Sequence, residues 1–484
     1  MKQAKIFEHR RSGVLLHITS LPSGTLGQDA YKFVDFLHES GVSVWQMLPL
    51  GPTHSDGSPY QCLSAHAVNA KLICLDTVKS QPWTDGEPFI GDTFLIILVH
   101  AYRQFIERAT EYERNQFHDF CEQQNYWLDD YVLYREIRHL NHTTAWFQWP
   151  QELRDRHDDA IQKIRDEREE ALNIRRFGQF LFFQQWEALK AYANERGISL
   201  FGDMPIFVAH DSADVWANPE LFTLDDNGLA TRVAGVPPDY FSETGQRWGN
   251  PLYSWDKHIS EDFSWWKQRV QTQLELFDLI RIDHFRGFEA CWEIPASCET
   301  AIDGKWVKAP GEQLFAQLTD TFGELPLVAE DLGIITDEVT ALREKYAMPG
   351  MKILQFAFGD DATNPYLPHH HTQDSVSYTG THDNNTTVGW FEELDEQTKS
   401  RIYEYLGGSQ ETIPWLLIRA SLASVSQLSV IPMQDILALN SEHRMNIPGT
   451  TEGNWIWRFD WDMVDETSAI RLKNLNELYG RSRT

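Results

Sequence analysis

The chain has 484 residues, of which 42% are hydrophobic and 13% aromatic, and it carries a formal net charge of −29. Such a composition supports a large core and excludes an intrinsically disordered chain. The negative charge disfavours nucleic acid and anionic membrane surfaces as partners, because both reward clustered Lys and Arg. It suits a neutral substrate, although solubility alone would also account for it.

Neither a membrane span nor a secretion signal is visible. No segment reaches the roughly 18 to 20 apolar residues of a membrane-spanning helix, and the first ten residues contain no apolar run. We therefore expect a cytoplasmic protein. The five cysteines form no CxxC pair, so we expect buried, reduced thiols at Cys62, Cys74, Cys121, Cys291 and Cys298.

Eight apolar runs bounded by turn residues predict buried strands of a parallel sheet. In chain order they span residues 13–21, 42–50, 198–208, 276–283, 325–330, 351–358, 375–381 and 428–433. Amphipathic patterns predict helices over residues 30–39, 178–196, 264–276, 313–322, 334–346, 415–426 and 465–479. Gly41 and Gly197 stand where a glycine ends a helix before the next strand. Alternation of strands and helices implies a parallel sheet, and eight such strand-based units indicate an α/β fold, the closed (β/α)8 TIM barrel.

Two intervals are too long for one strand–helix unit, and we interpret them as insertions at the C-terminal face of a single catalytic barrel, residues 1–484. Residues 54–197 are expected to be largely helical, with helices over 92–114 and 127–140. The charged run 151–172 is typical of a solvated helix face.

The second insertion, residues 209–260, is rich in Gly, Pro and aromatic residues and is expected to form part of the active-site rim. Its segment 234–255 is a candidate lid. The aromatic residues of that segment include Tyr240, Phe241, Trp248, Tyr253 and Trp255. We expect Tyr253 and Trp255 to pack inside the insertion and Trp248 to be available for stacking on a ligand.

Asp283 ends the fourth predicted strand, and Arg281 precedes it by two residues. Residues two apart in a strand point to the same side, so the guanidinium should lie beside the carboxylate and favour its ionised form, as a nucleophile requires. The alternative is a plain ion pair at a strand end. Asp203, inside the apolar third strand, needs a polar partner, which we expect to be Arg281 or another polar group near the barrel mouth.

Glu330 and Asp383 follow two further predicted strands. Glu330 should be partly withdrawn from water, which raises its pKa as a general acid needs. The alternative is that Glu330 or its neighbour Asp331 caps the helix 334–346. Asp383 follows His382, and the pair offers donors and acceptors to vicinal hydroxyls. Carboxylates at the ends of parallel strands converge on one pocket, the arrangement of glycoside chemistry.

The segments around Asp203, Asp283, Glu330 and Asp383 resemble the four strand-borne regions of the α-amylase superfamily. The chain most resembles the 4-α-glucanotransferases (amylomaltases, or disproportionating enzymes) of glycoside hydrolase family 77. The stretches that carry this resemblance are SPY at 58–60, GVPPDYFS at 235–242, GQRWGNPLY at 245–253 and GNW at 453–455. The resemblance extends from about residue 13 to residue 457.

This resemblance implies a (β/α)8 barrel that transfers α-1,4-glucan segments, with Asp283 as nucleophile, Glu330 as acid/base and Asp383 as transition-state stabiliser. It also implies further residues that contact the substrate. These are Arg281, His382, Tyr60, Ser58, Asp203, Gln246, Trp248 and Asn454. Neutral α-1,4-glucans would serve as donor and acceptor, without a metal or organic cofactor. The tract His369-His370-His371 is interpreted as surface or substrate-rim residues of a loop rather than as a metal site.

For a retaining mechanism we expect the carboxyl groups of Asp283 and Glu330 to lie about 5 to 5.5 Å apart. Two alternatives stay open at this point. One is an α-amylase-like hydrolase with the same three acids, and the other is a non-catalytic glucan-binding barrel.

Overall fold

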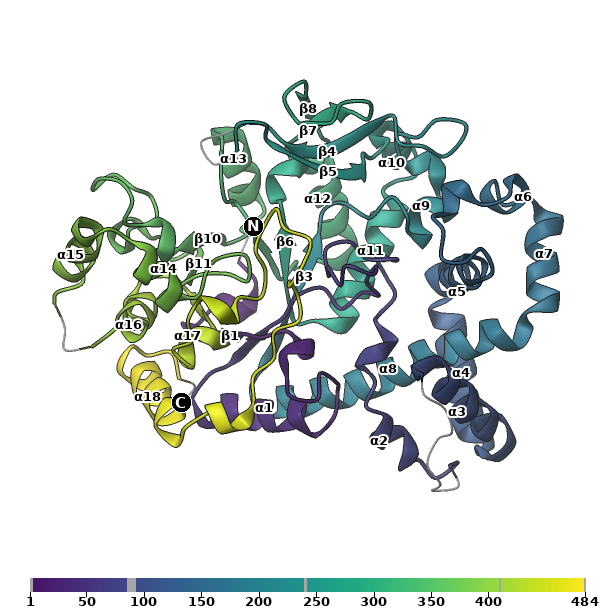
Figure 1. The fold of residues 1–484 in the computed structure, drawn as a ribbon, viewed down its shortest axis with the longest axis horizontal. Coiled ribbons are helices and arrows are strands. Elements are labelled where there is room, and N and C mark those ends of the chain that lie inside the picture. Colours follow the sequence, from purple (N-terminus) through teal and green to yellow (C-terminus); the bar gives the residue numbers. More distant parts are fainter. Residues whose placement is uncertain (1–2, 85–92, 239–241, 409–410, 483–484) are drawn as a thin grey trace.

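The computed structural model describes residues 3–84, 93–238, 242–408 and 411–482. Its central sheet has eight parallel strands in the order β10-β11-β12-β1-β2-β3-β6-β9 (Figure 1). The strands are β1 (Arg11–Leu15), β2 (Val44–Gln46), β3 (Ser199–Pro205), β6 (Leu279–Asp283), β9 (Leu327–Ala329), β10 (Gly350–Ile353), β11 (Ser375–Tyr378) and β12 (Leu428–Pro432). Each overlaps one predicted run, so the predicted (β/α)8 barrel is confirmed.

β9 and β10 stand at opposite ends of this strand order, and the contact between them closes the barrel. The Ala329 N–H donates to the carbonyl of Pro349 at 2.9 Å. The Asp331 carboxylate accepts the Met351 N–H at 2.7 Å and lies 3.3 Å from the Arg343 guanidinium. The Asp331 side chain therefore helps to join β9 to β10, directly after Glu330 in the chain.

This role of Asp331 corrects one prediction. Helix α13 (Asp337–Lys345) begins after Thr336, three residues later than predicted. The Asp331 carboxylate does not cap it, because the backbone of β10 and a buried arginine already occupy that carboxylate.

Amphipathic helices cover the barrel strands. The long ones are α1 (Gln28–Glu39), α8 (Glu169–Glu195), α11 (Ser264–Leu276), α12 (Gly311–Phe322), α16 (Trp415–Ala423) and α18 (Glu466–Leu478). In α1 the buried positions include Ala30, Phe33, Val34 and Leu37, the spacing of one helix face. The ring of Phe33 meets that of Trp45 in β2 at 4.8 Å between centroids, so this face forms part of the core.

Glycines end two of these helices as predicted. Gly41 and Gly197 have φ values of 69° and 73°, a left-handed conformation that glycine adopts without strain. The following residues donate back into each helix, Val42 to Leu37 at 2.9 Å and Ile198 to Ala193 at 2.9 Å. These are the bonds of a Schellman ending, and they turn the chain directly into β2 and β3.

Between β2 and β3 the chain is helical, as predicted, and lies on the right in Figure 1. The helices before α8 are α2 (Leu75–Lys79), α3 (Phe94–Arg108), α4 (Glu111–Gln123), α5 (Asn125–Leu140), α6 (Gln151–Arg154) and α7 (Asp158–Glu167). A capping box of Thr110 and Glu113 divides the predicted helix 92–114 into two. The insertion boundaries 54 and 197 stay a prediction.

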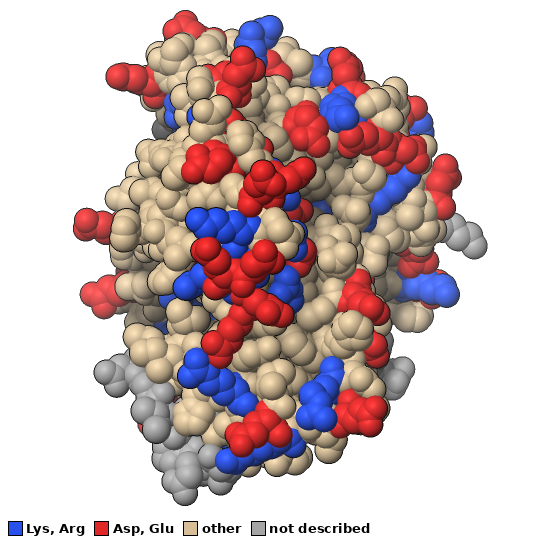
Figure 2. Space-filling view, turned by 90° about the vertical axis from the view of Figure 1, so that its right-hand side faces the viewer, with Lys and Arg blue, Asp and Glu red and all other residues tan. Residues whose placement is uncertain are grey.

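The charged run 151–172 is more than a solvated helix face. Glu136 of α5 is 1% exposed and binds two arginines, Arg168 at 2.6 Å and Arg175 at 2.7 Å. Acidic and basic side chains are interleaved on this side of the molecule, shown in Figure 2. The alternation in sequence therefore serves ion pairing between α5, α7 and α8, which the prediction of a solvated face missed.

A second, antiparallel sheet of four strands, in the order β5-β4-β7-β8, lies at the top of Figure 1. Its strands are β4 (Arg232–Val236), β5 (Gln246–Pro251), β7 (Ala290–Pro295) and β8 (Lys305–Lys308). β4 and β5 come from the second insertion, whose boundaries 209 and 260 stay a prediction. The structure thus shows a sheet where the sequence predicts only a Gly-rich and aromatic rim.

Part of the candidate lid can be placed. Tyr253 is 4% exposed and belongs to the main core, and the partly buried Trp255 packs against it at 5.1 Å between ring centroids. Tyr240 and Phe241 lie outside the described residues. The remaining short helices are α9 (Ala213–Ala217), α10 (Trp255–Ser260), α14 (Thr387–Glu393), α15 (Glu396–Tyr405) and α17 (Met433–Ile436).

Within the described ranges, no helix combines the length and the apolar character needed to cross a bilayer. All five cysteines carry free thiols, as predicted. Only Cys291 is buried, whereas the other four are partly exposed, so the prediction of burial is wrong for those four.

Candidate active site

The two principal carboxylates leave neighbouring strand ends. β6 and β9 pair with Ile282 opposite Ala329, so the next residues, Asp283 and Glu330, stand side by side at the mouth of the barrel. The Glu330 N–H donates to the Ile282 carbonyl at 3.0 Å. Since adjacent strands lie about 4.8 Å apart, both side chains begin within reach of one anomeric carbon. The predicted separation of the carboxyl groups stays a prediction.

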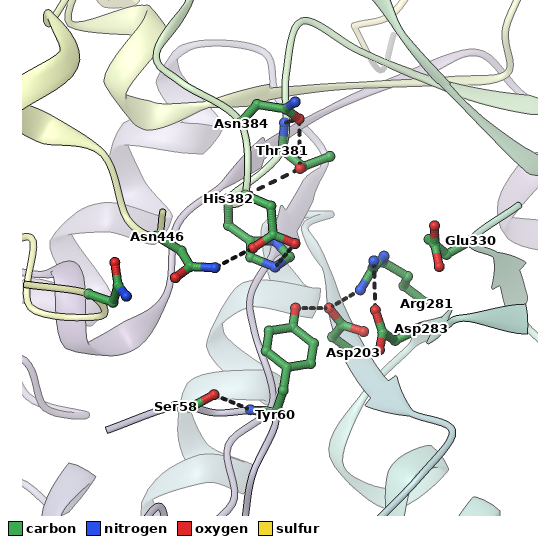
Figure 3. Close-up of polar contacts among 12 residues, drawn as sticks. Ser58, Tyr60, Asp203, Arg281, Asp283, Glu330, Thr381, His382, Asn384 and Asn446 are labelled. Atoms are coloured by element: carbon green, nitrogen blue, oxygen red, sulfur yellow. Dashed lines mark hydrogen bonds and ion pairs between the residues drawn. The ribbon is translucent and has the colours of Figure 1, made fainter. Parts of the chain in front are cut away.

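Arg281 joins two carboxylates, as the strand spacing predicts. Its guanidinium lies 2.6 Å from Asp203 and 3.0 Å from Asp283, and Figure 3 shows Glu330 beside it. Burial alone would lower the pKa of Arg281, but the two carboxylates outweigh it and hold this pKa well above its usual range. A permanent positive charge thus stands next to Asp283.

Asp203 is supported from a second side. Its side chain is 1% exposed, and it accepts a hydrogen bond from the Tyr60 hydroxyl at 2.7 Å. The Tyr60 ring in turn stacks on the His382 ring, with centroids 5.2 Å apart and planes 13° from parallel. The strands β3 and β6 and the loop after β11 therefore share one polar network.

Glu330 has the electrostatic setting of an acid. Burial raises its pKa to about 7, and the negative charge of Asp283 acts in the same direction. Arg281 and the backbone N–H of His284, which donates to Glu330 Oε2 at 2.7 Å, act in the opposite direction. Glu330 is therefore still partly protonated near neutral pH.

Asp383 has the opposite setting. Withdrawal from bulk water raises its pKa, but the His382 ring and the Asn446 amide more than offset this and hold the pKa of Asp383 well below its usual range. His382 Nε2 lies 3.3 Å from one carboxylate oxygen, and Asn446 Nδ2 donates to the other at 2.6 Å. Acids whose pKa values are pushed apart are suited to different roles in one reaction.

A family model described as 4-alpha-glucanotransferase matches residues 16–463 of the chain. The chain belongs to the 4-alpha-glucanotransferase family. The 4-alpha-glucanotransferase of Thermus thermophilus is 49% identical to it, over 97% of this chain and 98% of the relative. That of Synechocystis sp. is 46% identical, over 98% and 99%. The structure is similar to amylomaltase from Streptococcus agalactiae in complex with acarbose, with a TM-score of 0.93, 38% identity and coverage of 98% and 100%.

Membership of this family makes the chain an enzyme of the glycosyltransferase class with 4-α-glucanotransferase activity. The alternatives of a hydrolase and of a non-catalytic binding barrel are accordingly not favoured. The catalytic and substrate-binding roles of individual residues in this 4-α-glucanotransferase stay predictions.

The remaining residues implied by the resemblance occupy different positions around the acids. Ser58 accepts the Tyr60 N–H at 3.3 Å and so supports the turn that presents the Tyr60 ring. The Trp248 ring meets the His284 ring edge-on at 4.8 Å, and its N–H donates to Gln246 Oε1 at 3.1 Å. Trp248 therefore contacts His284, the residue whose backbone N–H binds Glu330, and Gln246 binds Trp248.

Asn454 is engaged within its own loop. Its carboxamide accepts the Ile447 N–H at 2.9 Å and donates to the carbonyl of Thr450 at 3.0 Å. The next residue, Trp455, approaches Tyr60 and His382, with ring centroids 5.9 Å and 6.0 Å away. Trp455, rather than Asn454, therefore contacts the rings of Tyr60 and His382 beside Asp383.

Sequence reasoning missed several residues of this site. His284 adopts a left-handed φ of 53°, which aims its N–H at Glu330, and Arg444 donates to the Asp383 carbonyl at 3.1 Å. Asn446 binds the Asp383 side chain across 63 residues. Only the position of His284, directly after Asp283, offered a signal.

The histidine tract lies apart from these acids. The rings of His369, His370 and His371 bond to the Tyr405 hydroxyl and to the carbonyls of Ala362 and Tyr366. His370 and His371 therefore have partners in the loop after β10, whereas the partner of His369 lies at the end of α15. His371 is buried, so the prediction of a surface position is wrong for this residue.

Proposed function

We propose that this enzyme cleaves an α-1,4-glucan and transfers the segment to the 4-hydroxyl of glucose or another α-1,4-glucan, with retention of configuration. The observation that carries the proposal is the pair Asp283 and Glu330 on adjacent strand ends, with Arg281 between two carboxylates. A pKa of about 7 at Glu330 completes the pair. Neutral glucans would serve as both donor and acceptor.

In the first step Glu330 protonates the glycosidic oxygen while Asp283 attacks the anomeric carbon from the other face. The bond to the leaving glucan breaks with its electron pair on that oxygen. The product is a covalent β-glycosyl-enzyme on Asp283. The guanidinium of Arg281, 3.0 Å away, orients the nucleophile before attack.

Asp383 would stabilise the transition state. As positive charge develops on the sugar ring, an ionised carboxylate near its hydroxyls binds the ring more strongly than in the ground state. We assign His382 and Tyr60 to the walls that hold the same sugar, because their rings stack beside Asp383.

In the second step Glu330, now a carboxylate, removes the proton from the incoming hydroxyl, which attacks the anomeric carbon and releases Asp283. A glucan acceptor gives transfer, and water gives hydrolysis. We assign Trp248 to the acceptor side, because its ring contacts His284, whose N–H binds Glu330, and Gln246 accepts the indole N–H. An indole face there can hold a sugar ring against competition from water.

Incubation with pure maltotriose tests the function as a whole. We expect glucose together with oligosaccharides longer than the substrate, because the glycosyl-enzyme is captured by another sugar before water. Mass spectrometry of the products, with reducing ends counted in parallel, measures the outcome. Products that are all shorter than maltotriose, with rising reducing ends, would contradict transfer.

The pKa of Glu330 predicts the alkaline limit of activity. The acid must be protonated in the free enzyme, so kcat/KM should fall as pH rises through about 7, by about tenfold for each further pH unit. Asp383, whose pKa is held low, stays ionised throughout this range. Initial rates on maltotriose at several pH values measure this, and a flat profile from roughly pH 6 to 9 would exclude Glu330 as the acid.

We also propose a cytoplasmic location. All five thiols are free, and unpaired cysteines are typical of proteins in a reducing compartment.

A further inference from the structure

The loop that carries His382 and Asp383 is held at both ends by one buried carboxylate. It leaves β11 at Thr379 and enters α14 at Thr387. Asp435 Oδ2 accepts the hydroxyl of Thr379 at 2.5 Å and that of Thr387 at 2.6 Å. Its other oxygen accepts the Thr387 N–H at 2.7 Å.

A buried carboxylate such as Asp435 is a costly group to use only for joining two chain segments. Its side chain belongs to α17, directly after β12, and the residue is 1% exposed. Burial raises its pKa, while the bonds from the two threonines act in the opposite direction. The donors that reach it are hydroxyls and a backbone N–H, which are neutral, so the carboxylate depends on all three bonds for its stability in this site.

Gln355 also contacts both ends of this loop, and its backbone N–H donates to the Thr379 carbonyl at 3.2 Å. Gln355 Nε2 donates to the carbonyl of Asn385 at 2.9 Å and to the Thr387 hydroxyl at 3.3 Å. At the centre, Asn446 binds the Asp383 carboxylate. Asp435 binds the hydroxyls of both the first and the last residue of the segment 379–387 with a single carboxylate oxygen, at 2.5 Å and 2.6 Å, so it helps to set the span that places Asp383.

We propose that Asp435 is a positioning residue for transition-state stabilisation by Asp383. It does not touch the sugar. It fixes the ends of the loop so that the Asp383 carboxylate meets the ring hydroxyls in the geometry that the transition state requires. The inference rests on the role of Asp383 proposed above.

Replacement of Asp435 by asparagine keeps the side-chain volume and turns one hydrogen-bond acceptor into a donor. An amide nitrogen then faces either the Thr387 N–H, as donor against donor, or the two hydroxyls, which must rotate to accept. Either arrangement shifts an end of the loop. Since a misplacement of about 1 Å can cost about 100-fold in rate, we expect kcat on maltotriose to fall about 10- to 100-fold in Asp435→Asn, with KM little changed.

A second pair of variants keeps the test decisive if Asp435→Asn folds poorly. Thr379→Val preserves the shape but removes the hydroxyl that reaches Asp435, so it should lose kcat, whereas Thr379→Ser keeps the hydroxyl and should retain it. Ser377→Ala is the control, because Ser377 lies two residues earlier, in β11, and its hydroxyl bonds to that of Ser421 at 2.9 Å rather than to Asp435. It should leave kcat unchanged.

A double-mutant cycle with Asp383→Asn separates positioning from a general structural effect. With α-maltosyl fluoride as donor, Asp435→Asn should lower the rate strongly in the wild-type background and less than about threefold when Asp383 is already asparagine. Equal losses in both backgrounds, or an unchanged kcat in Asp435→Asn and Thr379→Val, would overturn the inference. Full activity in Asp383→Asn would instead refute the proposed role of Asp383 itself.

Discussion

We expect the Asp283→Asn variant to lose about four to six orders of magnitude in kcat on maltotriose. The amide has the size of the carboxylate and can still accept from Arg281, so the fold and the ion pair of Arg281 with Asp203 should persist. What disappears is the negatively charged carboxylate oxygen that attacks the anomeric carbon. Glucose release in an initial-rate assay measures the loss, and circular dichroism checks the fold.

Asp278→Asn is a matched control for this variant. Asp278 precedes the same strand at its opposite end, where it accepts the Leu200 N–H at 2.8 Å and the Asn194 amide at 2.9 Å. Its replacement removes an equal charge far from the barrel mouth and should leave kcat close to that of the wild type. Comparable rates in Asp283→Asn and Asp278→Asn would eliminate Asp283 as the nucleophile.

For Glu330→Gln we expect a loss of about 10²- to 10⁴-fold on maltotriose, because the amide cannot protonate the leaving oxygen. With α-maltosyl fluoride the leaving group needs no proton, so the first step should continue. The second step lacks its base, and a maltosyl group should therefore accumulate on Asp283, detectable by peptide mass spectrometry.

The exposed residue Glu324 provides the control for this variant, since it precedes β9 at the end remote from the site, where it accepts only the Lys5 N–H at 2.7 Å. Glu324→Gln should behave as the wild type with both donors. If Glu330→Gln were impaired equally on maltotriose and on the fluoride, its role would not be that of an acid.

The barrel and its principal acids could be predicted because their signals are local. An apolar run that ends in a carboxylate, as at Asp283, predicts within a few residues both a strand and the end of the sheet where the carboxylate lies. The pairing of Arg281 with Asp203 followed from the need of a buried carboxylate for a partner, and the structure confirms it.

The features that escaped prediction depend on distant parts of the chain. The antiparallel sheet pairs Arg232 with Pro295 across more than 60 residues, and no periodicity within β4 or β7 reveals that partner. Asn446 and Asp435, which follow β12 in the chain, likewise bind the loop that carries Asp383. Polar residues in apolar or loop surroundings gain their meaning only when the fold brings their partners together.

Arg281 has a consequence for protein engineering. Because its single guanidinium divides its hydrogen bonds between two strands, and the Asp203 carboxylate on one of them also takes the Tyr60 hydroxyl, the nucleophile cannot be transplanted as one strand. A designer grafting this chemistry onto another scaffold would have to carry β3, β6 and the Tyr60 turn together as one module. The smallest transferable catalytic unit is thus larger than the three acids.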